Sequence, residues 1–151
     1  GTWSKKGSKS YFGYKLHTVQ GTDMPLIREF AVTSASLHDS NIDLGIPEIS
    51  NYRDKGYFGS KTRGMDGTMD RAPKKHKLTI DQIRRNRRIT RKLSPGERPY
   101  SVIKNMFNAR HVFVTMVRRE RVKAAFLCIG YNLFTLLSMK NKGRIAVAIK
   151  S

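Results

Sequence analysis

Acidic residues, cysteines and long apolar runs are all scarce in this chain of 151 residues. It contains 30 Lys and Arg against 11 Asp and Glu, which gives a formal net charge of +19. A charge of this size attracts polyanions and repels other basic surfaces, so nucleic acid is the first partner to consider. The single cysteine, Cys128, lies between Leu127 and Ile129, where a small buried side chain is expected. The sequence therefore predicts no disulfides and a cytoplasmic location.

The chain also lacks the segments that are typical of membrane and secreted proteins. Its most apolar run, 124–139, is shorter than the roughly 18 residues of a spanning helix and contains Asn132. Residues 1–6 have no apolar core of a signal peptide. We therefore expect no membrane partner. A hydrophobic content of 38% over this length predicts one ordinary core, and so a single domain over 1–151.

The N-terminal part predicts an antiparallel hairpin. Residues 10–20 alternate between apolar and polar side chains, as a half-buried strand does. Turn-forming residues over 21–25 separate this run from a second apolar run over 26–33. On the first strand, one face is predicted to carry Phe12, Tyr14 and Leu16.

Two further elements are predicted before residue 60. Asp39 or Ser40 resembles the N-cap of a short helix over 42–46. A third strand should end near Asp54, and a glycine-rich loop over 56–67 should follow it. The predicted division of the chain is thus strands over 1–60, a basic loop or arm over 61–95 and helices over 96–140.

The basic arm carries most of the expected contacts with DNA. Between 74 and 92 the positive charges are dense and few acidic residues intervene, so this segment is either a surface helix or a partly disordered arm. Solvated charge is the plain alternative, but this density favours a track for phosphates. The expected DNA-binding residues here are Lys74, Lys75, Lys77, Arg84, Arg85, Arg87, Arg88 and Arg91.

Two helices are predicted after the arm. The first covers 97–107, with Pro99 in its first turn, where the missing amide is harmless. The second covers 116–139 and should pack through an apolar stripe. That stripe is predicted to consist of Val117, Val122, Phe126, Ile129, Leu133, Leu136 and Leu137. Strands and helices together predict an α/β or α+β fold.

Asp54 and Glu97 are acidic residues in strongly basic surroundings. Carboxylates that hold divalent cations can stabilise the attacking and leaving oxygens when a phosphodiester is cut. Mg²⁺ needs only one or two such carboxylates, because water and substrate phosphate complete its shell. The two residues lie 43 positions apart, one at a predicted strand end and the other at a predicted helix start. Such elements can face one another across a cleft, although a turn or cap role is the more frequent use of each residue.

Several short segments, in this order and spacing, resemble the DDE-type transposases of bacterial and archaeal insertion sequences. The similarity covers nearly the whole chain. The segments are Lys5-Lys6-Gly7, Tyr11-Phe12-Gly13-Tyr14-Lys15-Leu16-His17, His38-Asp39-Ser40, Asp54-Lys55-Gly56-Tyr57, and Gly96-Glu97-Arg98-Pro99-Tyr100 with Lys104.

The resemblance implies an RNase H-like α/β fold in which two Asp and one Glu bind Mg²⁺ or Mn²⁺ for DNA cleavage and strand transfer. Asp54 matches the second aspartate and Glu97 the glutamate, so both are the expected catalytic and metal-binding residues. Lys104 matches a basic residue that contacts DNA, and Lys55 is expected to do the same. The implied partner is double-stranded DNA, namely transposon ends and target. The resemblance also allows a homodimer in the complex with DNA.

The family's first aspartate lies on a strand upstream of the Lys5-Lys6-Gly7 segment. Positions 1 to 22 contain no Asp. The resemblance therefore predicts a truncated copy, with a fold incomplete at its N-terminal strand and little or no activity alone. Two alternatives stay open: a non-catalytic basic DNA- or RNA-binding protein, and an inactive remnant that binds DNA or a full-length transposase.

Overall fold

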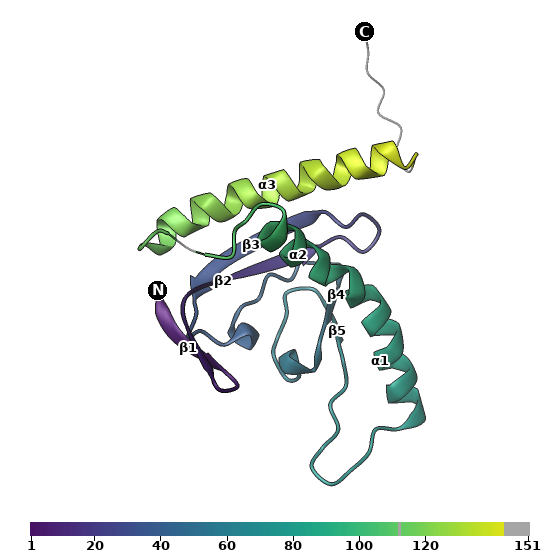
Figure 1. Cartoon of the computed structure of the whole chain (residues 1–151). Helices are drawn as coiled ribbons and strands as arrows, with labels where there is room; N and C mark the ends of the chain where they lie inside the picture. The colour runs from purple at the N-terminus through teal and green to yellow at the C-terminus, as the bar shows by residue number, and fades with distance from the viewer. Residues whose placement is uncertain (112, 144–151) are drawn as a thin grey trace.

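The computed structural model describes residues 1–111 and 113–143, so the end of the predicted domain, 144–151, lies outside the described residues. Helices and strands are mixed in one α/β arrangement (Figure 1). Two small sheets hold the strands, and three α-helices accompany them.

The first sheet has the order β1-β2-β3 and is antiparallel. It confirms the predicted hairpin, because β2 (Lys9–Gln20) pairs with β3 (Ile27–Ser34) around the expected turn. β1 (Thr2–Lys6) was not predicted, since Trp3 is its only large apolar residue. It pairs with residues 9–13 of β2, whereas β3 pairs with residues 14–20.

The second sheet consists of two parallel strands, β4 (Ser50–Arg53) and β5 (Met65–Thr68). β4 confirms the predicted third strand, which ends one residue before Asp54. β5 lies where a loop was expected. The prediction was wrong because Gly67 within the strand and Gly64 before it are typical of loops. Among the described residues no strand pairing joins the two sheets, so each keeps an unpaired edge.

Three single-turn 3-10 helices connect the larger elements: η1 (Asp39–Asn41), η2 (Lys55–Tyr57) and η3 (Ser94–Glu97). The predicted helix over 42–46 is wrong, because only the η1 turn forms. Its cap is also a correction: the ring Nδ1 of His38 accepts the bond from the Ser40 amide at 3.3 Å, rather than Asp39 or Ser40 capping the turn.

The basic arm contains a regular helix, α1 (Ile80–Leu93). Thr79 and Gln82 begin it with a capping box, in which each side chain bonds the other's backbone amide. On its inner side Asn86 and Ile89 are buried. Of the two alternatives for this segment, the surface helix therefore applies from residue 80 onward.

The core lies between the β2–β3 sheet and the helices α2 (Arg98–Asn105) and α3 (Val117–Asn141). Its buried members are Ile27, Val102, Ile103, Cys128 and Tyr131. Burial raises the pKa of the Cys128 thiol to about 11, as expected for a structural cysteine. Asn132 completes the packing, because its amide bonds both the N–H and the C=O of Ile27, at 2.8 and 2.9 Å.

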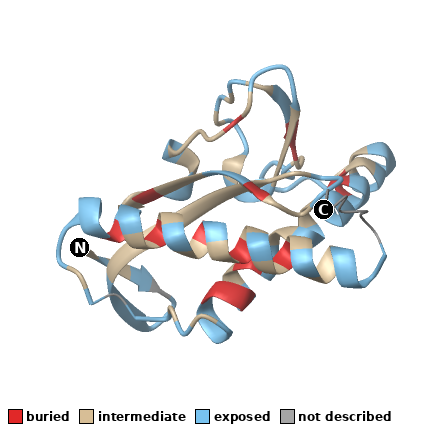
Figure 2. Cartoon of the chain, turned by 90° about the horizontal axis from the view of Figure 1, so that it is seen from above, coloured by how far each residue is buried: buried red, intermediate tan, exposed pale blue. Residues whose placement is uncertain are grey.

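The predicted packing face of α3 is wrong. Its buried residues are Glu120, Ala124, Cys128, Tyr131 and Thr135, and they form the line of buried positions along the helix in Figure 2. Tyr131 packs into the core and Leu127 and Phe134 lie partly buried against it, whereas most of the predicted stripe points outward. The exposed ones are Val117, Val122, Phe126, Ile129, Leu133 and Leu137. By length and composition α3 could cross a membrane, with a mean hydropathy of 1.5 over an 18-residue window of which 22% is buried, whereas the sequence predicted no apolar run of that length. Core helices of soluble proteins pass the same test of length and composition, but they are mostly buried.

Candidate functional site

Asp54 lies at the carboxyl end of β4, where the chain turns into η2. Its Oδ1 accepts a hydrogen bond from the Gly56 amide at 2.7 Å and so caps this turn. The side chain is exposed, and it has no ion-pair partner among the described residues. The cap uses only one oxygen, and the second remains available for a cation or for water.

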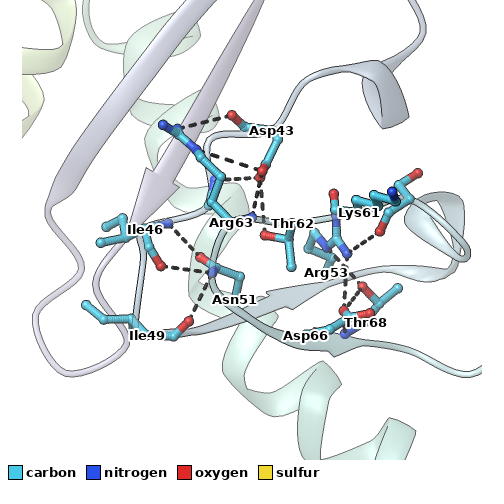
Figure 3. A network of polar contacts seen from close by, with 12 residues as sticks. Asp43, Ile46, Ile49, Asn51, Arg53, Lys61, Thr62, Arg63, Asp66 and Thr68 are labelled. Atoms are coloured by element: carbon cyan, nitrogen blue, oxygen red, sulfur yellow. Dashed lines mark hydrogen bonds and ion pairs between the residues drawn. The ribbon is translucent and has the colours of Figure 1, made fainter.

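A polar network holds the strand end that carries Asp54 (Figure 3). The Arg53 guanidinium donates to the Thr68 hydroxyl at 2.9 Å, to Asp66 at 3.1 Å and to the carbonyls of Ser60 and Lys61. The hydrogen bond from the Thr68 hydroxyl is the largest cause that lowers the pKa of Asp66. Asp66 and Arg53 therefore both stay ionised at neutral pH. The direction in which Asp54 leaves β4 is therefore fixed by its neighbour.

The same figure shows how the preceding loop is tied to this sheet. Asp43 accepts bonds from the amides of Gly45 and Arg63, each at 2.8 Å, and from the Thr62 hydroxyl. Burial acts to raise the pKa of Asp43, but these hydrogen bonds outweigh it and lower the pKa. Asp43 thus holds together two loop segments that lie about 20 residues apart in the sequence.

Glu97 ends η3 and stands immediately before α2. It is exposed and caps no amide with its side chain. As with Asp54, no ion pair engages it within the described part of the chain. Pro99 lies in the first turn of the helix, as predicted, and is buried.

A tyrosine follows each of the two carboxylates in the sequence. Tyr57 follows Asp54 by three residues, and Tyr100 follows Glu97 by three residues, one helical turn along α2. Burial raises the pKa of the Tyr57 hydroxyl, and the charges of Asp39 and Asp54 and the nearby Tyr100 raise it further.

Strand β2 meets the start of α2. The Thr18 hydroxyl donates to the Tyr100 oxygen at 3.0 Å, and the Gln20 amide donates to the Gly96 carbonyl at 3.1 Å. These bonds fix the residue before Glu97 and the residue one turn after it against the same strand. Glu97 is thus positioned from both sides.

Asp39 is a second carboxylate near Asp54, because η1 packs against η2. In the sequence, His38 and Asp39 could be read as a metal-binding pair, although a helix cap was the preferred interpretation. It accepts a hydrogen bond from Lys15 Nζ at 3.0 Å, which neutralises part of its charge. His17 lies beside this pair. It is half-buried, bonds the Thr33 hydroxyl at 2.8 Å, and burial lowers its pKa.

The chemistry available here is that of two exposed carboxylates in a positive field. No group of three or more His, Cys, Asp and Glu side chains is placed to hold a metal ion within the ranges 1–111 and 113–143. Asp54 and Glu97 are both open to solvent, and neither forms an ion pair with a cation in the described part of the chain. Oxygen ligands of this kind suit Mg²⁺ or Mn²⁺, which keep several waters in their shell.

The predicted DNA-binding residues separate into four groups, of which the last lies on the outer side of α1. Lys55 lies in η2 beside Asp54, and Lys104 lies in the last turn of α2; both are exposed. The exposed lysines Lys74, Lys75 and Lys77 lie in the loop before α1. Arg85 differs from the rest, because it bonds Asp70 at 2.9 Å and the Thr68 carbonyl at 2.8 Å and so anchors α1 to β5.

The remaining arginines of the arm form a stripe on the outer side of α1. They line one shallow depression together with Asp81: Arg84, Arg87, Arg88 and Arg91. Only Arg84 has an acidic partner among the described residues, Asp81 at 3.7 Å on the exposed surface. Because positions three and four apart share a helix face, this arginine stripe presents successive cations along one line.

No family model, curated protein or solved structure matches this chain.

Proposed function

We propose that this chain is part of the catalytic domain of a DDE-type transposase with an RNase H-like fold, acting on DNA. Asp54 and Glu97 bind the divalent cation in this proposal. Lys55, Lys104, the lysines of the 74–77 loop and the arginine stripe bind the phosphates of double-stranded DNA. The proposed reaction is cleavage at transposon ends, followed by strand transfer.

Two features of Asp54 and Glu97 support this proposal. Asp54 stands at the end of β4 and Glu97 directly before α2; both are exposed, and neither has an ion-pair partner among the described residues. A net charge of +19 adds the attraction that a DNA ligand requires. The resemblance of the sequence segments supplies the rest of the argument.

The residues fit a magnesium-type ion in their chemistry. Both side chains are carboxylates, both are exposed, and Asp54 uses only one oxygen for its cap. When bound, the cation would polarise the scissile phosphate and stabilise the developing charge. The chain's own residues orient this region: Arg53 fixes the strand end, while Thr18 and Gln20 fix the start of α2.

The first test is the salt dependence of DNA binding. Binding to duplex DNA should weaken steeply as salt rises, because each neutralised phosphate releases a counterion. Replacing Arg87 and Arg91 with Gln should reduce the slope of log K against log salt by about one for each phosphate that is no longer neutralised. The matched control is Arg28→Gln, an exposed arginine outside the stripe. Affinity that does not change with salt would contradict the proposal.

The second test is calorimetric titration with Mn²⁺. Asp54→Asn and Glu97→Gln should each weaken cation binding by about tenfold or more, since each removes a charged ligand. Asp81→Asn is the control, because this exposed carboxylate lies on α1 beside Arg84. Equal binding by the Asp54 variant and the original chain would show that the proposed metal site is wrong.

A non-catalytic DNA-binding protein is the second candidate function. It is favoured by the net charge of +19, which attracts DNA or RNA without any metal site. The two candidates differ in the titration, because a pure binding protein has no saturable cation site. Both predict the same salt-dependent attraction to DNA.

A further inference from the structure

A two-stranded ribbon projects from the first sheet. It is formed by β1 and by residues 9–13 of β2, joined through Gly7 and Ser8, with Gly7 at φ +62° as a tight hairpin turn requires. β3 pairs only with later residues of β2, so no third strand covers the ribbon. In Figure 1 it lies on the side of the molecule away from α1.

The ribbon carries a pair of exposed aromatic rings. Trp3 and Phe12 are direct cross-strand partners, with ring centroids 5.3 Å apart. Their exposed fractions are 67% and 62%, so neither ring is part of the core. Core packing, the usual role of such residues, therefore does not explain them.

The charge around these rings is of one sign. Lys5 lies two residues after Trp3 on β1, hence on the same face, about 6.6 Å along the strand. Lys9 follows the turn and is exposed. Residues 1–22 contain no Asp or Glu. The ribbon thus combines apolar ring faces with cations and has no acidic residue of its own.

This combination favours one class of partner. Unpaired nucleobases present flat π-faces to aromatic side chains, and the adjoining phosphates are attracted to lysines. In a closed duplex the bases are stacked on one another, so their faces cannot receive the rings. An apolar protein surface would leave Lys5 without a counterion, whereas a nucleic-acid strand supplies both features.

We propose that the ribbon face carrying Trp3, Lys5 and Phe12 binds an unpaired base of a nucleic-acid strand by stacking. The site takes single-stranded or locally opened DNA, with Lys5 at the flanking phosphate. It rests on the proposed function only in that nucleic acid is the ligand, and it is independent of Asp54 and Glu97.

The chain's only tryptophan makes the test direct, because its fluorescence reports on Trp3 alone. A short oligothymidine should quench this emission. A blunt duplex and an abasic oligomer of equal charge should quench it far less. The same titration with a short oligoribonucleotide distinguishes RNA from DNA as the source of the base.

Affinity measurements on variants complete the test. Trp3→Leu and Phe12→Leu should each weaken oligothymidine binding by about 5- to 100-fold, the range expected for losing one base–aromatic stack. Binding to the blunt duplex should change by less than about twofold. Phe126→Leu is the matched control, because this ring is 71% exposed on α3, outside the ribbon. Circular dichroism checks that each variant is folded.

The outcomes separate this proposal from the proposed function. Unchanged tryptophan emission with oligothymidine, or equal affinity for the Trp3 variant and the original chain, would overturn the stacking site while leaving salt-dependent duplex binding in place. Dimerisation that Trp3→Leu abolishes, without any effect of oligothymidine, would assign the ribbon to a second copy and also overturn it. If binding to the oligothymidine and to the duplex both became independent of salt, the proposed function would instead be overturned.

Discussion

Two parts of the molecule are held together by different forces. The apolar part consists of β2, β3, α2 and α3, and it contains most of the buried hydrophobic residues. The polar part consists of β4, β5 and α1, where Ile89 is the only such residue among those described. Directional bonds from Arg53, Arg85 and Asn86 connect its elements instead.

This difference matters because Asp54 belongs to the polar part and Glu97 begins a helix of the apolar part. Apolar burial contributes most of the stability but is not directional. Hydrogen bonds contribute less on balance, yet they fix orientation and are costly to leave unmade. The geometry of the candidate site therefore depends on how well the polar part keeps its register against the core.

The largest expected effect comes from the apolar part. Ile103→Ala should lower the free energy of unfolding by about 2–5 kcal/mol, because this side chain is only 4% exposed and its removal leaves a cavity. Urea denaturation measures the change. Leu133→Ala, at a position that is 62% exposed on α3, is the control and should stay within about 0.5 kcal/mol. Equal effects would mean that α2 does not contribute to the core.

A smaller loss is expected from the polar part. Asn86 accepts a bond from the Asp70 amide at 2.8 Å and donates to the Asp70 carbonyl at 2.9 Å. Asn86→Ala leaves both groups unpaired and should cost about 1–3 kcal/mol in the same urea experiment. Arg84→Ala, which removes only an exposed ion pair, serves as control. If the Asn86 variant is as stable as the original chain, the polar part does not rely on this connection.

The smallest expected effect is a pH dependence confined to the polar part. The pKa of Asp66 is lowered from 3.8, first by the Thr68 hydroxyl, so its folded pKa lies below its unfolded one. Its contribution is therefore complete above about pH 4 and is lost as the pH falls through the folded value. Hydrogen exchange between pH 5 and 3 should show β4 and β5 losing protection before β2 and β3. Asp66→Asn should remove this difference, and simultaneous loss in both sheets would contradict it.

The strand pattern of the apolar part could be predicted because alternation leaves a clear signal. Residues 10–33 alternate with period two around a turn, and they form β2 and β3. The same logic failed for β5, where four residues with a glycine among them carry no such period. Its formation depends on β4 and on the Arg53 network, which are distant in sequence.

The face of α3 could not be predicted from hydrophobicity alone. The helix is apolar on several sides from Ala124 onward, so periodicity does not choose between them. The face that is buried carries Ala124, Cys128 and Thr135 together with Tyr131. This mixture of small side chains and one large ring has no stronger hydrophobic signal than the other sides of the helix.

For the candidate site, residue identities were easier to find than their connections. Asp54 and Glu97 were found because an acid in a basic sequence is conspicuous. Sequence spacing could not establish that Asp39 lies near Asp54, since this proximity arises only when η1 and η2 meet. Arg85 was grouped with the DNA-binding arginines, and only the fold reveals its bond to Asp70.

The outward stripe of α3 has a consequence for handling the protein. Phe126, Leu133 and Leu137 are each more than half exposed, and burying one such side chain gains roughly 1.5–3 kcal/mol. Colloidal repulsion between molecules of charge +19 opposes that gain in dilute buffer. At 1 M salt the Debye length falls to about 3 Å, and the repulsion fades. We therefore expect added salt to precipitate the protein rather than to increase its solubility.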